Sequence, residues 1–399
     1  MGVGFSSIAP KGMPRGARLC LAGMSLMGIA DGIFVVIFQF YLISLGFGSN
    51  EIGTIFMTRM VGVAILTLPM GVLSDRYGRA RVLTGGLLFF IVGLAIIPFA
   101  RTVEAFSLVL LLMGVAASAA VVLGPIYSSF FRGEEMDRAF GIQGFLNIIA
   151  SSVGSLAGLI PPMLVSGWSV GTAESYRLVL YVATAFYLTS MPFFVLSATS
   201  AKEPARGSGP RLMIRSVGTV ARFSVFSALN GLGYSVFFGL LSYYAYTRFA
   251  VDSAGVGVLL SATMLVNASA YLTAPRISGR VGTLRAISLS LGLCAPFYLL
   301  AAYAPSFATF SVVILAHIFL ANICSPLSTS LYMKSLSDDE KGAATGASTV
   351  ANMSFSALGT QLGGIMMGTT LGAPIYVGAA VYAANAAWSL LLRKETVKH

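Results

Sequence analysis

The chain carries little charge. Asp, Glu, Lys and Arg make up 10% of its 399 residues, whereas hydrophobic residues make up 56% and the mean hydropathy is +0.85. Because soluble domains carry about 25% charged residues, this composition excludes a soluble globular protein. It predicts a chain that is solvated by lipid from end to end.

Histidine and cysteine are also scarce, with two and three residues. The sequence has no H-E-x-x-H or G-x-S-x-G pattern and no His/Asp cluster, which argues against an integral-membrane enzyme. We therefore expect no catalytic residue, no metal and no cofactor. Cys20, Cys294 and Cys324 lack the spacing of a metal site or disulfide framework and are interpreted as small hydrophobic residues. A phosphate-binding P-loop is missing too, so ATP-driven transport would need a separate ATPase.

Apolar stretches of about 20 residues, the length that crosses a bilayer as a helix, alternate with short polar loops. They predict an all-α membrane protein with twelve transmembrane helices. The predicted spans are 18–44, 52–73, 82–100, 104–128, 139–165, 173–197, 218–247, 254–277, 285–304, 307–333, 341–369 and 372–394.

The cations divide unequally between the two sides of this predicted topology. Arg101, Arg177 and Arg248 fall on one side and Arg59 lies within the second span, whereas every other Lys and Arg falls on the other side. By the positive-inside rule both termini are cytoplasmic, and we expect a multi-pass protein of the cell inner membrane with a retained first helix. The net charge of +11 lies in short loops, so it predicts contact with anionic lipid headgroups and no binding of nucleic acid.

An internal repeat divides the chain into two halves. Residues 201–216 form the longest polar stretch and are predicted to link an N-terminal six-helix bundle, residues 1–200, to a C-terminal one, residues 217–399. A shift of 204 residues superposes identical residues at the following positions: Ala17/Ala221, Arg18/Arg222, Phe34/Phe238, Ser49/Ser253, Gly53/Gly257, Arg76/Arg280, Gly78/Gly282 and Arg81/Arg285. Tandem halves of this kind predict a substrate site between them and alternating access.

The loop after the second span carries the most specific motif, G-V-L-S-D-R-Y-G-R-A-R-V-L, from Gly71 to Leu83. It resembles the signature loop of the major facilitator superfamily, which lies between the second and third helices of that family. The resemblance implies two pseudo-symmetric six-helix bundles and a conformational gate formed by Gly71, Asp75, Arg76, Gly78 and Arg79. Gly71 is expected to permit close helix approach and Gly78 a tight turn. The copy in the second half is degraded, since Gly279 replaces the acid.

Subfamily motifs are missing. Leu110 stands where drug:proton antiporters carry an arginine in the fourth span, and the sixth span is not followed by the P-E-S-P-R sequence of sugar porters. The resemblance therefore assigns neither branch.

Asp31 is the one acid that we cannot place in a loop or at a span end. A charge there costs at least about 2.5 to 3.5 kcal/mol, which predicts a function, and a role in proton coupling is expected. Arg59 lies at a similar depth in the next span and is the expected ion-pair partner, so the open alternatives are a permanent structural pair and an Arg59 that extends to the interface.

Four further positions are predicted to line the substrate cavity together with His317 of the tenth span, which could also titrate near neutral pH. They are Phe34, Phe38, Asn230 and Tyr234. A histidine that only fills a helix interface is the alternative for His317.

These features predict a secondary transporter, acting as a monomer, for proton-coupled efflux or antiport of amphipathic or cationic small molecules. An uptake symporter for a small polar metabolite or organic anion is the alternative, with Arg59 or His317 as substrate ligand. A receptor that has lost transport is less favoured, because the motif from Gly71 to Leu83 is intact.

Overall fold

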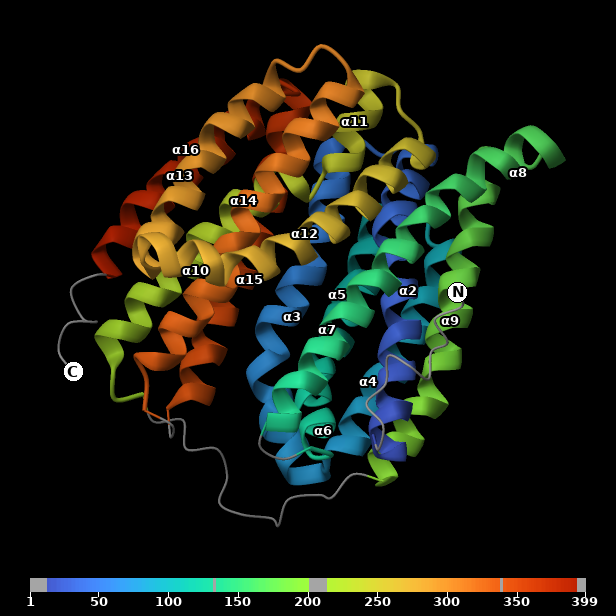
Figure 1. Ribbon diagram of the computed structural model, residues 1–399. Coiled ribbons are helices and arrows are strands. Elements are labelled where there is room, and N and C mark those ends of the chain that lie inside the picture. Colours follow the sequence, from blue (N-terminus) through green and yellow to red (C-terminus); the bar gives the residue numbers. More distant parts are fainter. Residues whose placement is uncertain (1–12, 132–133, 201–213, 338–339, 393–399) are drawn as a thin grey trace, which may run out of the picture.

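The computed structural model describes residues 13–131, 134–200, 214–337 and 340–392, all of them helical or in short connections (Figure 1). The helices of the first half are α2 (Arg15–Ser44), α3 (Ser49–Tyr77), α4 (Arg79–Ile96), α5 (Val103–Ser118), α6 (Leu123–Ser128), α7 (Glu134–Ser155), α8 (Ile160–Trp168) and α9 (Thr172–Ser200). Those of the second half are α10 (Val217–Phe238), α11 (Leu241–Phe249), α12 (Ser253–Val281), α13 (Thr283–Ala302), α14 (Phe307–Lys334), α15 (Lys341–Thr369) and α16 (Ala373–Leu391).

Short 3-10 turns join some of these helices into one span. Ala119–Val122 connects α5 to α6, and Leu156–Leu159 connects α7 to α8. Within the described residues, nine helical segments are long and apolar enough to cross a membrane; α3, α15 and α16 are not among them. These three pack within the bundles beside helices that are, which is consistent with the predicted twelve spans.

Two bundles make up the molecule, one from each half of the chain (Figure 1). In the first, α2 packs on α7 and α9 while α3 packs on α5; in the second, α10 packs on α15 and α16 while α13 packs on α14. The bundles meet through α3 against α15 and α7 against α12. Residues 201–213 of the predicted linker lie outside the described part of the chain.

The two ends of the bundles differ in charge. We call the end with the loops at Gly78, Gly282 and Ser335–Ser337 the basic end, and the end with the loops at Leu45–Gly48 and Ala250–Asp252 the opposite end. The three arginines of the opposite end donate hydrogen bonds to backbone carbonyls. Arg101 and Arg177 bind the Pro98 carbonyl at 2.8 and 3.3 Å, and Arg248 binds the Ala304 carbonyl at 3.1 Å. Unpaired carbonyls at helix ends attract cations, so these arginines are held by the fold.

The repeat read from the sequence recurs in the backbone. Gly78 and Gly282 both stand between two helices with φ of 95° and 88°, a conformation that only glycine adopts easily. Tyr127 donates to the Ala139 carbonyl at 3.1 Å, and Tyr332 donates to the Ala344 carbonyl at 2.9 Å. Both of these residue pairs are 205 positions apart, so the register moves by one residue toward the end of each half.

Glu340 ties together the starts of α10 and α15. Its carboxylate accepts hydrogen bonds from the backbone N–H groups of Arg215 and Ser216, each at 2.9 Å, and from the Ser337 backbone at 3.1 Å. These bonds favour the charged form and lower the pKa of Glu340 to about 2. The carboxylate therefore stays ionised at physiological pH and anchors the chain where it enters the second bundle.

The Gly78 turn leads to a test. Gly78→Ala should destabilise the protein by at least about 1 kcal/mol, because alanine is strained at positive φ. We expect the same loss from Gly282→Ala. Gly85→Ala is the matched control, since Gly85 lies inside α4 and an added Cβ there would meet no atom within 4 Å. The melting temperatures of the purified proteins measure the effect, and equal values for the Gly78 and Gly85 variants would contradict it.

Candidate functional site

Asp31 lies in the middle of α2 and is held by Tyr187 of α9. The Tyr187 hydroxyl donates a short hydrogen bond to the Asp31 carboxylate. Tyr187 is 1% exposed and Asp31 is half-buried. A carboxylate inside a bilayer needs a donor, and the tyrosine supplies one from a helix that packs along α2. This pair is the polar centre of the first bundle.

Arg59 of α3 completes the cluster without forming the expected direct ion pair. Its guanidinium carbon lies 5.4 Å from the centre of the Phe34 ring and 6.0 Å from that of Phe90. The Phe90 ring in turn lies 4.7 Å from the Tyr187 ring. Among the described residues, no carboxylate oxygen approaches the guanidinium within salt-bridge distance. Aromatic faces attract a guanidinium, so Arg59 rests on the rings of the cluster while its charge acts on Asp31 from further away.

His317 of α14 is fully buried inside the second bundle. Its ring packs edge-to-face on Tyr298 and Tyr382, with centroids 4.1 and 5.1 Å away, and parallel to Phe238 at 5.7 Å. Nδ1 lies 3.3 Å from the Cys294 carbonyl, whereas Nε2 is buried with no partner among the described residues. The structure thus places His317 in an aromatic cage of one bundle and not on an open cavity wall.

The other residues predicted to line the cavity fall into two groups. Phe34 and Phe38 stack on each other at 4.9 Å and are 1% and 0% exposed, so in this conformation they are core residues of the first bundle. Tyr234 is 51% exposed and stacks on Phe238, and Asn230 is half-buried one turn away. Of the residues predicted to line the cavity, only Asn230 and Tyr234 of α10 are accessible.

Two equivalent contacts close the molecule at its opposite end. Ser49, the first residue of α3, donates to the Gly364 carbonyl of α15 at 2.9 Å, and a Cβ built on Gly53 would lie 3.1 Å from Gly364 Cα. Ser253, the first residue of α12, donates to the Gly158 carbonyl at 2.8 Å. A Cβ on Gly257 would lie 3.2 Å from Gly158 Cα.. Because these residues have small side chains, the backbones of the two halves approach each other directly.

Gln39 of α2 adds a third contact between the halves. Its amide nitrogen donates to the Gly239 carbonyl at 3.0 Å, and its amide oxygen accepts from the Ser242 backbone at 3.0 Å. Gly239 and Leu240 form the break between α10 and α11, where backbone groups lack helical partners. The buried Gln39 side chain therefore supplies hydrogen-bond partners for two backbone groups at this helix break in the other half.

The gate motif lies at the basic end and makes no such contact. A Cβ on Gly71 would meet no atom within 4 Å, and the same holds for Gly141 of α7, Gly279 of α12 and Gly342 of α15. Arg76 packs over the neighbouring Tyr77 ring at 5.5 Å, and neither Arg76 nor Arg79 has a hydrogen-bond partner among the described residues. The Asp75 side chain lies outside the described part of the structure. The four helices that touch at the opposite end therefore stand apart at the basic end (Figure 1).

Three functional residues were missed by sequence reasoning. Ser49 and Ser253 served only as evidence for the repeat, and Tyr187 was not singled out. The repeat itself held the signal, because a Ser-x-x-x-Gly pattern recurs at the start of the second and eighth spans. Tyr187 lies at the depth of Asp31, but nothing distinguishes it from the other tyrosines of the chain.

In the part of the chain that the structure describes, these contacts define a multi-pass helical membrane protein whose halves touch at the opposite end and stand apart at the basic end. The model of the Major Facilitator Superfamily matches residues 20–360. The chain belongs to the Major Facilitator Superfamily, as the signature loop implied.

Two curated relatives match only part of the chain in sequence. Multidrug transporter MdfA of Escherichia coli O6:H1 is 26% identical over 190 residues, which are 48% of this chain and 42% of MdfA. The uncharacterized MFS-type transporter YfkF of Bacillus subtilis is 28% identical over 150 residues, 36% of this chain and 35% of YfkF. The chain thus matches less than half the length of these relatives.

Solved structures resemble the whole fold at lower identity. The POT family transporter PepTSo superposes with a TM-score of 0.75 at 14% identity, covering 98% of this chain and 100% of PepTSo. A bacterial homologue of the iron transporter ferroportin in an inward-facing state also gives 0.75 at 13% identity, with 95% and 99% covered. These structural similarities show that the chain has the same fold as these two proteins.

The Asp31–Tyr187 contact predicts coupled stability effects. Tyr187→Phe should cost about 1 to 3 kcal/mol of unfolding free energy, because it removes the donor of a buried carboxylate. In a cycle with Asp31→Leu the double variant should lose less than the sum of the single losses, with about 1 kcal/mol of coupling. Unfolding in mixed micelles measures the four proteins. The matched cycle of Arg59→Gln with Asp31→Leu should give a smaller coupling, and a larger one there would refute the assignment of Tyr187 as the main partner.

The glycine contacts predict a conformational shift. Gly53→Leu should separate the halves at the opposite end, because the new side chain meets backbone atoms of Thr360 and Gly364. Spin labels on cysteines placed at Arg79 and Lys341 should then report shorter distances across the basic end. Gly71→Leu is the control, since it enters open space and should leave the long distance in place. Distances unchanged by Gly53→Leu would contradict the closure at Gly364.

Proposed function

We propose that the protein is a proton-coupled secondary transporter that exports amphipathic or cationic small molecules across the cell inner membrane by antiport. The observation that carries the proposal is the Asp31–Tyr187–Arg59 cluster inside the first bundle. It supplies an acid that can bind a proton, a donor that stabilises the charged acid, and a cation that acts on it from beyond contact distance.

Alternating access supplies the mechanism. The described conformation is closed at the opposite end by Ser49, Gly53 and Gly364 with their counterparts, whereas Gly71, Gly141, Gly279 and Gly342 at the basic end face open space. With both termini cytoplasmic, this is an inward-facing conformation, and the likeness to the inward-facing ferroportin homologue supports it. Rocking of the bundles would close the basic end around the loop from Gly71 to Arg79, where Asp75 and the arginines gate the cycle.

Transport of drug-like compounds is favoured by one relative, which is named a multidrug transporter of Escherichia coli. We propose export as the direction of transport. Uptake of a polar metabolite remains the second candidate, because the second bundle holds a cavity with many hydroxyl groups. A receptor without transport is not supported, since all elements of the signature loop are present. We propose that the chain acts as a monomer with lipids as its only standing partners.

His317 is the alternative coupling group. It is the one imidazole in the described part of the chain, and its unpaired Nε2 could accept a proton. Its aromatic cage makes the charged form costly, so we assign coupling to Asp31 and packing to His317.

Asp31→Asn tests the coupling. The variant keeps the size of the side chain and accepts the Tyr187 hydrogen bond but cannot bind and release a proton. In proteoliposomes with an imposed pH gradient and clamped membrane potential, it should no longer accumulate radiolabelled phenyltrimethylammonium or phenyl β-D-glucopyranoside. Counterflow of the same probes should persist, because exchange needs no net proton movement.

Asp252→Asn is the control for this experiment. Asp252 is a helix N-cap at the opposite end, where asparagine serves equally well, so accumulation should be unchanged. If Asp31→Asn still concentrates either probe, His317 or another ion must carry the coupling. If wild-type protein accumulates neither probe under the gradient, proton-coupled export of amphipathic compounds is refuted.

A further inference from the structure

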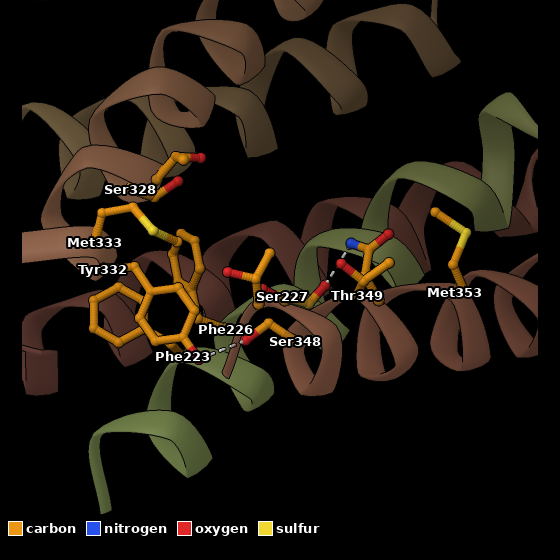
Figure 2. A pocket seen from close by; sticks show the side chains of 12 residues that line it. Phe223, Phe226, Ser227, Ser328, Tyr332, Met333, Ser348, Thr349 and Met353 are labelled. Carbon is orange, nitrogen blue, oxygen red and sulfur yellow. Dashed lines mark hydrogen bonds between the residues drawn. The ribbon is translucent and has the colours of Figure 1, made fainter. Parts of the chain in front are cut away.

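A cavity of about 250 Å³ lies inside the second bundle near the basic end (Figure 2). Helices α10, α14 and α15 form its walls. The lining residues are Phe223, Phe226, Ser227, Ser328, Thr329, Tyr332, Met333, Thr345, Ser348, Thr349, Asn352 and Met353. Its volume is slightly below the range of about 300 to 1,000 Å³ typical of pockets for drug-sized ligands, which suits a smaller compound.

One wall of the cavity is apolar and aromatic. Phe223 and Tyr332 stack with centroids 4.4 Å apart at an angle of 23°, and each is 6% exposed. Phe226 continues this surface and Met333 lies beside Tyr332, whereas Met353 lies at the other end of the cavity, beyond Thr349 (Figure 2). Stacked rings offer an apolar face to a ligand, and methionines adapt to its shape.

Hydroxyl and amide groups cover the remaining walls, and several are free to bind. Tyr332 and Ser348 are used within the protein, since Ser348 donates to the Tyr332 hydroxyl at 3.1 Å. The Asn352 amide nitrogen donates to the Ser227 carbonyl at 2.8 Å, which fixes the side chain and leaves its oxygen available. In the part of the chain that the structure describes, the hydroxyls of Ser227, Thr329 and Thr349 have no protein partner.

Charge is absent from this lining: none of the twelve residues is Asp, Glu, Lys, Arg or His. An ion that leaves water for such a cavity would lose hydration without gaining a counter-charge. A neutral ligand with hydrogen-bonding groups pays no such penalty, and the free hydroxyls would discriminate against an analogue without them.

The free hydroxyl groups of the cavity have no counterparts at the corresponding positions of the first half. The framework of the cavity recurs, because Tyr332 and Asn352 correspond to Tyr127 and Asn147 in the 205-residue register. The free hydroxyls do not recur. Ser227 corresponds to Gly23 in the 204-residue register of the first helices, and Thr329 and Thr349 correspond to Gly124 and Gly144 in the 205-residue register. Packing of the fold therefore does not require these hydroxyls.

We propose that this cavity is a binding site for an uncharged amphipathic compound, one with hydroxyl or amide groups on one edge and an apolar face on the other. The free hydroxyls of Ser227, Thr329 and Thr349 with the Asn352 oxygen bind the polar edge, and the Phe223–Tyr332 stack carries the apolar face. The proposal rests on the proposed transport function and narrows its substrate class from amphipathic or cationic to neutral. The site lies in one bundle, near the end where the halves stand apart.

The test compares two probes that share a phenyl ring and differ in charge. Phenyl β-D-glucopyranoside is neutral and hydroxylated, and phenyltrimethylammonium is a cation. Binding is measured on the purified full-length protein by calorimetry and by the shift of melting temperature at millimolar concentrations. We expect the glucoside to bind at least about tenfold more tightly than the cation. The variant Ser227→Ala with Thr349→Val should weaken glucoside binding about tenfold, since hydroxyl donors are lost with little change of volume.

Matched variants separate this site from the transport mechanism. Gly124→Ala alters the position that corresponds to Thr329 in the first bundle, where a Cβ has open space, and should leave glucoside affinity unchanged. Asp31→Asn should also retain it, so a failure of proton coupling is distinguishable from a failure of this site. Three results would overturn the assignment. They are binding of the cation as tight as or tighter than that of the glucoside, unchanged glucoside affinity of the double variant, and no glucoside binding at millimolar concentration. A lower melting temperature of the unliganded double variant would identify misfolding, and Thr329→Val, at an exposed position, then repeats the test.

Discussion

In lipid, a buried polar group must find its partner within the protein, and most polar contacts of this chain follow from that constraint. The constraint forces every described span into a helix, and it explains the side chains that cross between helices. Tyr187 donates a hydrogen bond to the carboxylate of Asp31, and Arg101 donates to the carbonyls where α4 ends. Gln39 forms hydrogen bonds with backbone groups at the break between α10 and α11. Each contact lies where the chain departs from an uninterrupted apolar helix.

The same constraint shows what could be predicted from the sequence. Helix positions follow from hydropathy, and Gly78 and Gly282 follow from the repeat and the motif. Asp31 could be singled out because an acid within a span is costly. The rotation of each helix about its axis could not be predicted, because lipid and protein core are both apolar and no hydrophobic face separates them. Phe34 and Phe38 were therefore expected on a cavity wall that they do not reach, and His317 was expected there although aromatic rings enclose it.

The partner of Asp31 illustrates a second limit. Charge complementarity pointed to Arg59, and the depth of the two residues agrees with that expectation. A guanidinium can also rest on aromatic rings, and Phe34 and Phe90 offer them beside the acid. The hydrogen bond to the Asp31 carboxylate is then donated by a neutral side chain, that of Tyr187. Among 16 tyrosines, no local pattern marks the one that does so.

The contacts that close the opposite end have an energetic consequence. Glycine and serine present almost no apolar side-chain surface, so separating Ser49, Gly53 and Gly364 and their counterparts exposes little apolar surface. What is lost is a few hydrogen bonds, each with a net value of about 1 kcal/mol. If the bundles rock between two conformations as proposed, these contacts contribute little to the free-energy difference between them. A proton or a small molecule that binds one of them tenfold better shifts the equilibrium by about 1.4 kcal/mol, which is comparable to any single contact holding that end shut.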